Sequence, residues 1–508
     1  MKKAIILAAG IGSRLRPITE RKPKCLVEVG GKPMLGYSID ALIAHGIEDI
    51  VIVTGYLSDS VQRYCAETYP GRSFTFVDNS DFDTTNNLYS LYLTRKHLTG
   101  DTLVMNGDLV FDASVIAKLK AVRTSAVAVD VGRYMEESMK VVVKGGFVTS
   151  ISKKIPPHLA YGCSIDVYKF VKKDVKELVR ELESTIKRGS LNEWTEAALD
   201  RLFSKGAIQA KPVAIGRARW AEIDNLDDLH AAEALFNPLR GQIARKKIFF
   251  IDNDGTLAIQ DGGTLRVLPE ARDFLKSLAR TKKHFYICTN NSSFTPTDIV
   301  SKFKAQGITI PEKHVLISTR SAMEHLKAEG VKRLYSMANR KTSLWLKKSG
   351  FIFERTKPQA LLLCYDTELT YAKLSEFIQL VRAGVPYYAT HIDKVCPTEH
   401  GPIPDIGLFI DMIEATTGKR PLQTFGKPDT NFILPILRAH KLKPKDAVVV
   451  GDRLYTDMVL AKKSGALSVL ALSGETKRPD YEFSDIRADV LVRDVGELRD
   501  ILNDKAAA

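Results

Sequence analysis

Short apolar runs rich in β-branched residues alternate with amphipathic helical stretches along the whole chain, and this alternation constrains the fold most. Strand-like runs lie at residues 4–7, 50–54 and 102–106, and a helix-like stretch lies at 34–44. A second series begins at residues 247–251. Such alternation predicts parallel strands with helices on both faces of a sheet. We therefore expect an α/β protein.

The length of the chain and one turn-forming link predict two domains. At 508 residues the chain exceeds what one hydrophobic core usually organises. A predicted helix ends just before Asn237, Pro238 and Gly241, which are typical of a link. We predict an N-terminal domain over residues 1–240 and a C-terminal domain over residues 245–505.

Within the second domain, an additional α/β stretch separates two groups of polar motifs. We interpret this stretch, about residues 320–388, as an inserted cap. The core of the domain would then consist of residues 245–319 and 389–505.

Composition and cysteine spacing argue against several classes of protein. Hydrophobic residues make up 44% of the chain and charged residues 26%, and no apolar run approaches the roughly 18 residues that span a bilayer. We expect neither a disordered protein nor a membrane partner. The net charge of +14 comes from Lys and Arg residues interspersed with acids, which argues against nucleic-acid binding. The six cysteines lie too far apart for a zinc site or a disulfide framework, so we expect a cytoplasmic protein.

The first chemical motif follows the first predicted strand directly. Small residues at positions 8–10, 12 and 13 let backbone N–H groups approach a polyphosphate, while Arg14 and Lys24 supply positive charge. The loop lacks Gly-Lys-Ser/Thr and does not match G-x-G-x-x-G, so it is neither a Walker loop nor a dinucleotide-binding motif. It indicates a nucleotide-phosphate site of another type.

Two acidic segments lie further along the first domain. Asp108 follows a predicted strand, and Asp224 lies in Trp-Ala-Glu-Ile-Asp-Asn at 220–225. Two carboxylates together with substrate phosphates form the oxygen-rich shell that Mg²⁺ prefers. Capping of a turn is the alternative role for both aspartates.

The string of residues 7–33 resembles the sugar-phosphate nucleotidyltransferase family. The resemblance implies a Rossmann-like, GT-A-like mixed sheet and Mg²⁺ bound by Asp108 and Asp224. It also implies that Lys24 and Arg14 are catalytic, in an in-line attack of an acceptor phosphate on the α-phosphorus of a nucleoside triphosphate. The residues implied to bind the nucleotide are Leu7, Ala8, Ala9, Gly10, Gly12, Ser13, Arg14, Lys24, Asn86 and Gly107.

Two segments bear on the nucleotide and the acceptor. Asp-Thr-Thr-Asn-Asn-Leu-Tyr-Ser-Leu-Tyr at 83–92 resembles CTP:phosphocholine cytidylyltransferases, and the 220–225 segment is similar to phosphonate cytidylyltransferases. The resemblance implies CTP and a small acceptor that is phosphocholine-like, aminoethylphosphonate-like or a polyol phosphate. A sugar-1-phosphate nucleotidyltransferase that uses UTP or dTTP is the alternative.

The acceptor pocket is open to several interpretations. A quaternary ammonium would need an aromatic cage, although aromatic residues on α/β elements also pack in plain cores. Glu193 would suit an amine instead, and Lys153, one of a lysine pair, is implied to meet the acceptor phosphate. The candidate acceptor-binding residues are Asn87, Tyr89, Lys153, Tyr161, Glu193 and Trp194, with Trp220 as a further aromatic candidate.

The second domain opens with an apolar strand at 249–251 that ends in Asp-Asn-Asp-Gly-Thr. A regular strand would place Asp252 and Asp254 on one side at the carboxyl edge of the sheet, where paired carboxylates suggest a nucleophile and an acid/base. Later segments add a hydroxyl, a lysine and further acids, namely Thr289 in Thr-Asn-Asn-Ser-Ser, Lys427 in Gly-Lys-Pro, and Asp452 and Asp457 in Gly-Asp-Arg-Leu-Tyr-Thr-Asp.

This order of motifs resembles the haloacid dehalogenase phosphatases and is most similar to their p-nitrophenyl phosphatase-like, NagD-type branch. The resemblance implies a Rossmann-like core with an inserted α/β cap of the C2 type. Asp252 would attack phosphorus, Asp254 would act as the acid/base, and Lys427 and Thr289 would hold the phosphate. Mg²⁺ would be bound by Asp252, Asp254, Asp452 and Asp457, and the substrate by Asn290 and Asn291.

The chain departs from that branch at two segments. Cys-Tyr-Asp stands at 364–366 and Thr-His-Ile-Asp at 390–393, where the branch more often has Gly-Leu-Asp and Thr-Asn-Pro-Asp. These differences leave the phosphatase substrate open. We interpret His391 as a hydrogen-bonded structural histidine.

Together the motifs predict a bifunctional enzyme with Mg²⁺ at both sites, acting on CTP, a small phosphorylated or phosphonate acceptor, and a phosphomonoester. A nucleotide-sensing module attached to an active phosphatase is the alternative from another class. Retention of Lys24, Asp108 and Asp224 argues against it, because binding alone would tolerate their loss. The order of the two reactions, and whether the chain forms a homo-oligomer, stay open.

Overall fold

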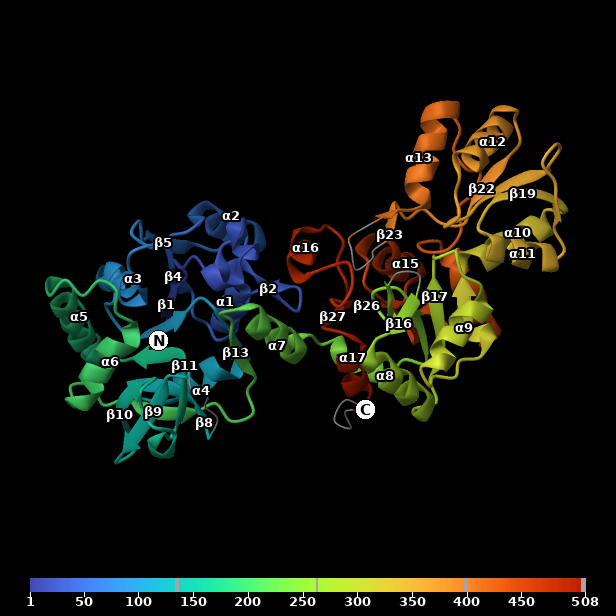
Figure 1. Cartoon of the computed structure of the whole chain (residues 1–508). Coiled ribbons are helices and arrows are strands. Elements are labelled where there is room, and N and C mark those ends of the chain that lie inside the picture. Colours follow the sequence, from blue (N-terminus) through green and yellow to red (C-terminus); the bar gives the residue numbers. More distant parts are fainter. Residues whose placement is uncertain (133–136, 262–263, 397–400, 402, 504–508) are drawn as a thin grey trace. The chain divides into compact units, whose positions relative to one another are not determined.

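The computed structural model divides the chain into two compact units (Figure 1). The first unit spans Met1–Asn237 and the second Pro238–Ala508. The described residues are 1–132, 137–261, 264–396, 401 and 403–503.

The first unit is built on a mixed β-sheet with strand order β10-β9-β11-β6-β1-β4-β5, in which β8 also pairs with β11 and β12. Strands β1, β4, β5 and β6 are parallel, whereas β11 is antiparallel to β6. The carboxyl ends of the parallel strands meet at one edge, where ligands bind in open α/β sheets. The strands are β1 (Lys3–Leu7), β4 (Asp49–Thr54), β5 (Phe74–Asp78), β6 (Thr102–Asn106), β8 (Ala126–Val131), β9 (Lys140–Lys144), β10 (Phe147–Ser152), β11 (Gly162–Phe170) and β12 (Lys211–Ala214).

Helices cover both faces of this sheet, because successive side chains of a strand point to opposite faces. Ala4 and Ile6 of β1 pack in a core with α1, α2 and α4, whereas Ile5 and Leu7 pack in a second core with α3, α5 and α6. The helices are α1 (Met34–Ala44), α2 (Ser58–Thr68), α3 (Asn87–Leu93), α4 (Ser114–Ala121), α5 (Lys172–Lys187), α6 (Thr195–Ser204) and α7 (Leu226–Phe236).

A short antiparallel ribbon brings a segment near the end of the first unit beside the segment that follows β6. Strand β13 (Trp220–Glu222) pairs with β7 (Leu109–Phe111), and the backbone N–H of Ile223 donates to the carbonyl of Asp108 at 3.0 Å. The ribbon thereby places Asp224 beside Asp108. A smaller ribbon pairs β2 (Glu28–Val29) with β3 (Lys32–Pro33).

The core of the second unit is a parallel sheet with strand order β18-β17-β14-β25-β26-β27. Phe249 and Ile251 of β14 pack with α8, α9 and α17, whereas Ile248 and Phe250 pack with α14 and α15. The elements are β14 (Ile248–Asp252), β17 (His284–Thr289), β18 (Val315–Ile317), β25 (Ala447–Gly451), β26 (Leu467–Ala471), β27 (Val490–Val492), α8 (Pro269–Arg280), α9 (Pro296–Ala305), α14 (Leu434–Ala439), α15 (Val459–Ser464), α16 (Arg478–Phe483) and α17 (Val495–Asn503). A hairpin of β15 (Ala258–Asp261) and β16 (Thr264–Val267) follows β14.

A cap is inserted between β18 and β25 and contains a smaller sheet with strand order β20-β19-β21-β22. Helices α10 and α11 pack on one face of this sheet and α12 and α13 on the other. Because α13 belongs to the cap core, the cap continues past the predicted end at residue 388. The elements are α10 (Ser318–Ala328), β19 (Arg333–Met337), α11 (Arg340–Lys348), β20 (Ile352–Phe353), β21 (Ala360–Leu363), α12 (Tyr371–Arg382), β22 (Tyr387–Ala389), β23 (Val395–Cys396), β24 (Ile403–Pro404) and α13 (Ile406–Thr417).

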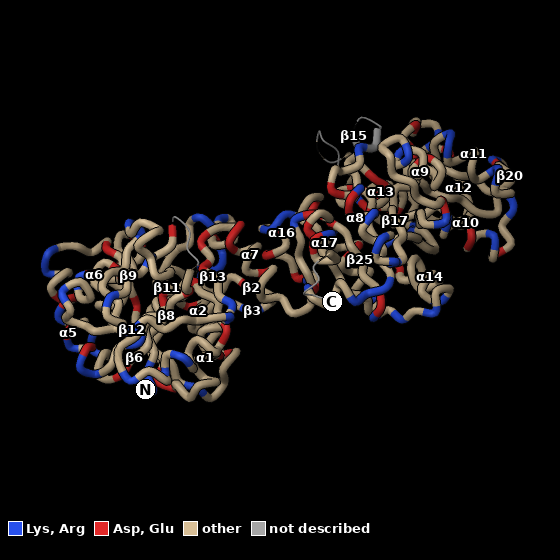
Figure 2. The backbone as a smooth tube through the Cα atoms, turned by 90° about the horizontal axis from the view of Figure 1, so that it is seen from below, with Lys and Arg blue, Asp and Glu red and all other residues tan. Residues whose placement is uncertain are grey.

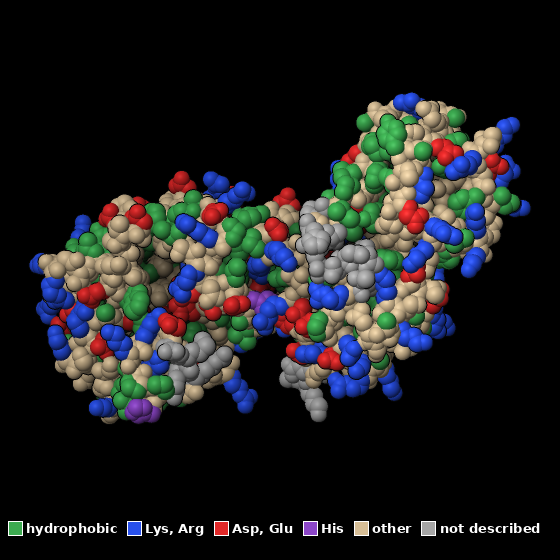
Figure 3. Space-filling view, viewed as in Figure 1, with side chains coloured by type: hydrophobic (Ala, Val, Ile, Leu, Met, Phe, Trp, Pro, Cys, Tyr) green, Lys and Arg blue, Asp and Glu red, His purple; other side chains and the backbone are tan. Residues whose placement is uncertain are grey.

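The α/β class is confirmed, with a mixed sheet in the first unit and a parallel sheet with a cap in the second. Lys and Arg are interspersed with Asp and Glu along the backbone of each unit (Figure 2), and side chains of both signs are scattered over the visible face (Figure 3). Among the described residues, no helix combines the length and the apolar character needed to cross a membrane.

Candidate active sites

A cavity of about 380 Å³ lies at the carboxyl ends of β1 and β6 in the first unit. All the residues predicted to bind the nucleotide line this cavity. Gly12 adopts a left-handed backbone conformation with φ of 69°, and a Cβ there would lie 2.9 Å from the side chain of Lys24. A glycine is therefore needed for the loop to pack against the stem of the lysine.

Lys24 bridges two acids that lie far apart in the sequence. Its Nζ is 2.6 Å from Asp108 Oδ2 and 2.7 Å from Asp224 Oδ1, and Arg14 Nη2 lies 2.9 Å from Asp224 Oδ2. Burial alone would lower the pKa of Lys24, but the two aspartates raise it above its usual value. Lys24 and Arg14 in turn outweigh the effect of burial and hold the pKa of Asp224 below its usual value. Lys24 therefore remains a cation in the cavity.

A third acid joins the two predicted carboxylates. Ligand oxygens of Asp108, Glu222 and Asp224 lie within 4.8 Å of one another, and Asp108 Oδ1 is buried without a hydrogen-bond partner. An orphaned carboxylate oxygen within such a group fits a divalent cation with oxygen ligands. Glu222 was missed from the sequence, although its position two residues before Asp224, on one side of an extended segment, was the available signal.

Further acids at the cavity were also missed. Asp166 and Glu196 are buried and line the cavity, and the hydroxyl of Tyr168 lies 2.8 Å from a carboxyl oxygen of each. Burial and neighbouring carboxyls raise the pKa of Asp166, and desolvation together with the charge of Asp166 raises that of Glu222 to about 8. A hydroxyl has one proton to donate, so the arrangement suits a proton shared between Asp166 and Glu196. The signal for Asp166 was an acid in the middle of a strand whose residues are all buried.

The predicted acceptor-binding residues divide into two groups. Asn87, Lys153 and Trp194 line the cavity, and Lys153 Nζ lies 4.9 Å from the centre of the Trp194 ring. Three others are not among the described lining residues, namely Tyr89, Tyr161 and Glu193. Glu193 instead pairs with Arg201 at 2.8 Å, Tyr89 stacks on Tyr92, and the indole N–H of Trp220 donates to Asp130. The predicted residues therefore do not form an aromatic cage.

In the second unit, Lys427 bridges the end of β14 and the helical turn that follows β25. Its Nζ lies 2.5 Å from Asp252 Oδ1 and 2.7 Å from Asp457 Oδ1, and all three side chains are buried. Burial raises the pKa of Asp252 to about 8 and that of Asp457 to about 6, although Lys427 opposes both shifts. The two aspartates raise the pKa of Lys427 despite its burial.

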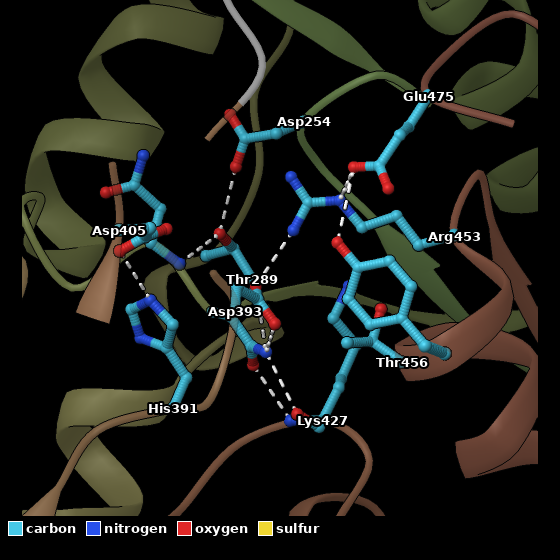
Figure 4. A network of polar contacts seen from close by, with 12 residues as sticks. Asp254, Thr289, His391, Asp393, Asp405, Lys427, Arg453, Thr456 and Glu475 are labelled. Atoms are coloured by element: carbon cyan, nitrogen blue, oxygen red, sulfur yellow. Dashed lines mark hydrogen bonds and ion pairs between the residues drawn. The ribbon is translucent and has the colours of Figure 1, made fainter. Parts of the chain in front are cut away.

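The acids of the second unit fit a divalent cation. Ligand oxygens of Asp252, Asp452 and Asp457 lie within 4.8 Å of one another, and Asp452 Oδ1 is buried without a hydrogen-bond partner. Asp254, which we predicted as a fourth ligand, is not part of this cluster. Its carboxylate instead accepts a hydrogen bond from Thr289 Oγ1 at 3.1 Å, because the side chain points towards that loop (Figure 4). Asp254 therefore contacts the loop that carries Thr289 and does not belong to the cluster of Asp252, Asp452 and Asp457.

The predicted substrate residues Asn290 and Asn291 make hydrogen bonds to other residues of the protein. The amide of Asn290 donates to the backbone carbonyl of Lys427 at 3.0 Å and lies 3.3 Å from Asp393, while its oxygen accepts from the N–H of Lys427. Asn291 accepts from the hydroxyl of Ser293 at 2.6 Å. Both side chains hold the loop that carries Thr289.

Models of known families match both units. The nucleotidyl transferase family matches residues 3–140, the haloacid dehalogenase-like hydrolase family matches residues 249–352, and a HAD-hydrolase-like family matches residues 424–498. The chain joins a nucleotidyl transferase to a haloacid dehalogenase-like hydrolase. It is an enzyme with a transferase unit and a phosphatase unit, as the motifs predicted.

Individual relatives match one unit each. CMP-5'-(3-aminopropyl)phosphonate synthase of Streptomyces rubellomurinus is 28% identical over 249 residues, which are 47% of this chain and 40% of that protein. The chain therefore spans less than half the length of this relative. Dihydroxyacetone phosphatase of Corynebacterium glutamicum is 27% identical over 258 residues, which are 50% of this chain and 92% of that protein. The crystal structure of a 4-nitrophenylphosphatase from Thermotoga maritima is 33% identical and covers 51% of this chain and 98% of its own, with a TM-score of 0.49.

Proposed function

We propose that the first unit transfers a cytidylyl group from CTP to a small phospho-alcohol or phosphonate and releases pyrophosphate. The second unit hydrolyses a phosphomonoester through an aspartyl phosphate, and Mg²⁺ acts at both sites. The same observation supports both activities. In each unit a lysine, Lys24 or Lys427, bridges two carboxylates at the carboxyl edge of a sheet, where an anionic substrate needs both a cation and metal ligands.

In the transfer, an acceptor phosphate oxygen attacks the α-phosphorus of CTP, and the bond to pyrophosphate breaks as the new bond forms. Both reactants are anionic, so catalysis consists mainly of alignment and neutralisation of charge. Arg14 and Lys24 line the cavity beside the glycine loop, and Lys153 supplies a cation for the acceptor phosphate. Mg²⁺ held by Asp108 and its neighbouring acids would neutralise the phosphates further.

CTP is favoured over other nucleotides by two observations. The segment at 83–92 has the Asn-Asn-x-Tyr-Ser-Leu pattern, and Asn86 and Asn87 line the cavity. A relative over the first unit is named as a CMP-phosphonate synthase. Both support cytidylyl transfer.

The acids of the cavity favour an acceptor with an amine. Asp166, Glu196 and Glu222 all line the cavity and interact electrostatically with one another, and an ammonium group would balance their charge. Among the described lining residues only Phe82 and Trp194 are aromatic, fewer than the cage that a quaternary ammonium uses. We therefore favour an aminoalkylphosphonate or a similar amine over phosphocholine.

In the hydrolysis, Asp252 attacks phosphorus, and the bond to the alcohol breaks as an aspartyl phosphate forms. Asp254 gives a proton to the leaving oxygen and then takes one from the water that attacks the intermediate. Burial raises the pKa of Asp254, which suits a group that must hold a proton at first. Lys427 limits the repulsion between Asp252 and the incoming phosphate.

The test follows pyrophosphate and phosphate release separately. The full chain is incubated with Mg²⁺, one of CTP, UTP or dTTP, and a panel of aminoalkylphosphonates, phosphocholine and polyol phosphates. We expect CTP-dependent pyrophosphate release that is fastest with an amine-bearing acceptor. Preference for UTP or dTTP across the panel would overturn the cytidylyl assignment in favour of a sugar-1-phosphate nucleotidyltransferase.

A variant tests the choice of acceptor. Asp166→Asn should lower kcat/KM for amine-bearing acceptors by roughly 10- to 100-fold, the loss expected for one hydrogen bond to a charged group, and should spare polyol phosphates. An equal loss for both classes would mean that Asp166 only supports the sheet. Binding of CTP without turnover across the whole panel would instead favour the sensing module.

A further inference from the structure

His391 is completely buried in the segment of residues 390–393, which follows cap strand β22 and precedes α13. Its Nε2 lies 3.0 Å from Asp405 Oδ1, and its Nδ1 lies 3.3 Å from the hydroxyl of Thr390 (Figure 4). Asp405 also accepts the N–H of Ile406 at 2.7 Å and so forms the N-cap of helix α13. His391 therefore ties the start of a cap helix to the segment of residues 390–393.

The contacts of the ring suit a proton on both nitrogens. An ionised carboxylate only accepts hydrogen bonds, so Nε2 carries a proton towards Asp405. Thr390 has its own acceptor, Ser292 Oγ at 2.9 Å, so its oxygen is available to accept from Nδ1. A neutral ring with its proton on Nε2 would keep the bond to Asp405 but would have no proton on Nδ1 to donate to Thr390.

The charges around the ring also favour a positively charged His391. Asp405, Asp393 and Arg453 face His391, while Tyr365 and Cys396 lie around Asp405. Arg453 is already paired with Asp393 at 2.8 Å and with Glu475 at 2.9 Å, which leaves His391 to balance Asp405. Burial alone would lower the pKa of His391, but Asp405 and Asp393 raise it above its usual value.

The same segment touches the loop that carries Thr289. Thr390 donates to Ser292 on that loop, and Ser292 also accepts the N–H of Tyr365 from the cap at 2.7 Å. Asp393 lies 3.3 Å from the amide of Asn290, which is bonded to the backbone of Lys427. A displacement of α13 or of residues 390–393 would therefore reach the loop that carries Thr289.

We propose that His391, as an imidazolium, is a positioning residue of the phosphatase that holds cap helix α13 against the loop of residues 289–293. This role goes beyond a structural hydrogen bond, because it makes the position of α13 relative to that loop depend on the charge of the ring. It rests on the phosphatase function proposed above.

The sign of the pH dependence follows from the raised pKa in the folded protein. An unfolded histidine has a pKa near 6.5, so the stabilisation by His391 is fully present below about pH 6.5. It is lost as the pH rises through the folded value, because the charge-assisted bond to Asp405 becomes a neutral one. The contact between the start of α13 and the loop of residues 289–293 should weaken over the same pH range.

The test uses p-nitrophenyl phosphate and Mg²⁺ with the full chain between about pH 5.5 and 9. Wild-type kcat/KM should lose about three- to tenfold more than that of His391→Asn as the pH rises, mainly through KM, because the asparagine has no charge to lose. Asp405→Asn keeps a good N-cap but removes the carboxylate charge, so the decline of kcat/KM should begin at a lower pH than in the wild-type protein. His158→Asn, an exposed histidine of the first unit, is the matched control and should keep the wild-type profile.

Histidine NMR supplies a second measurement. The resonance that disappears in His391→Asn should titrate with a raised pKa in the wild-type protein and with a lower one in Asp405→Asn. The positioning role is overturned if the active His391→Asn variant keeps the wild-type pH dependence of kcat/KM. It is also overturned if the decline of kcat/KM in Asp405→Asn occurs at the same pH as in the wild-type protein. Absence of hydrolysis by the wild-type chain at every pH overturns the phosphatase function itself, and with it this role.

Discussion

Lys24→Met removes one charge from the transferase cavity and keeps most of the volume of the side chain. Nζ of Lys24 lies within 2.7 Å of oxygens of Asp108 and Asp224, so the methionine deletes a cation held at the metal-binding acids. Loss of a group aimed at developing charge costs about 3–4 kcal/mol of transition-state stabilisation. Because each 1.36 kcal/mol is tenfold in rate, kcat for pyrophosphate release should fall about 10²- to 10³-fold.

The same variant should bind a divalent cation more tightly in the absence of nucleotide. Asp108, Glu222 and Asp224 would then lack the lysine that competes with a metal for their charge. Mn²⁺ binding followed by electron paramagnetic resonance measures this effect, and CTP-dependent pyrophosphate release measures the rate. Lys32→Met, at a lysine paired with Asp40 outside the cavity lining, is the matched control and should change neither quantity.

Two results would refute this reasoning. Turnover within about threefold of the wild-type value would mean that Lys24 does not face the reacting phosphates. A slow variant that binds Mn²⁺ more weakly would mean that Lys24 supports the metal site instead of neutralising substrate.

The remaining predictions concern the independence of the two units. Asp252→Asn should abolish phosphate release and spare pyrophosphate release, and Asp108→Ala should do the reverse, because each site has its own carboxylates. Loss of both activities from either folded variant would contradict two separate sites. Phe274→Ala, at a fully buried ring, should destabilise the second unit by about 3–5 kcal/mol. Calorimetry should show the melting transition of that unit alone moving down, and a common shift of both would argue against independent unfolding. EDTA should stop both reactions and Mg²⁺ should restore them, whereas activity that persists in EDTA would exclude a metal role.

The local parts of both sites could be predicted from the sequence. The glycine loop after β1 and the Asp-Asn-Asp-Gly-Thr loop after β14 each follow a buried strand directly, so their chemistry lies within one short segment. The α/β class follows from hydrophobic periodicity, which is also a local property. Family resemblance supplied the distant partners of Lys24 and Lys427, and the structure brings those partners within hydrogen-bonding distance.

Only the tertiary structure decided the walls of the sites and the extent of the cap. Asp166, Glu196 and Glu222 come from separate elements that converge through sheet pairing and helix packing, and no local pattern encodes that convergence. For the same reason the sequence could not show that Tyr89 and Tyr161 are not among the described residues that line the cavity. Helix α13 belongs to the cap because its apolar face is buried against the cap sheet. Hydrophobic periodicity predicts that such a helix has a buried face, but it does not predict which surface covers that face.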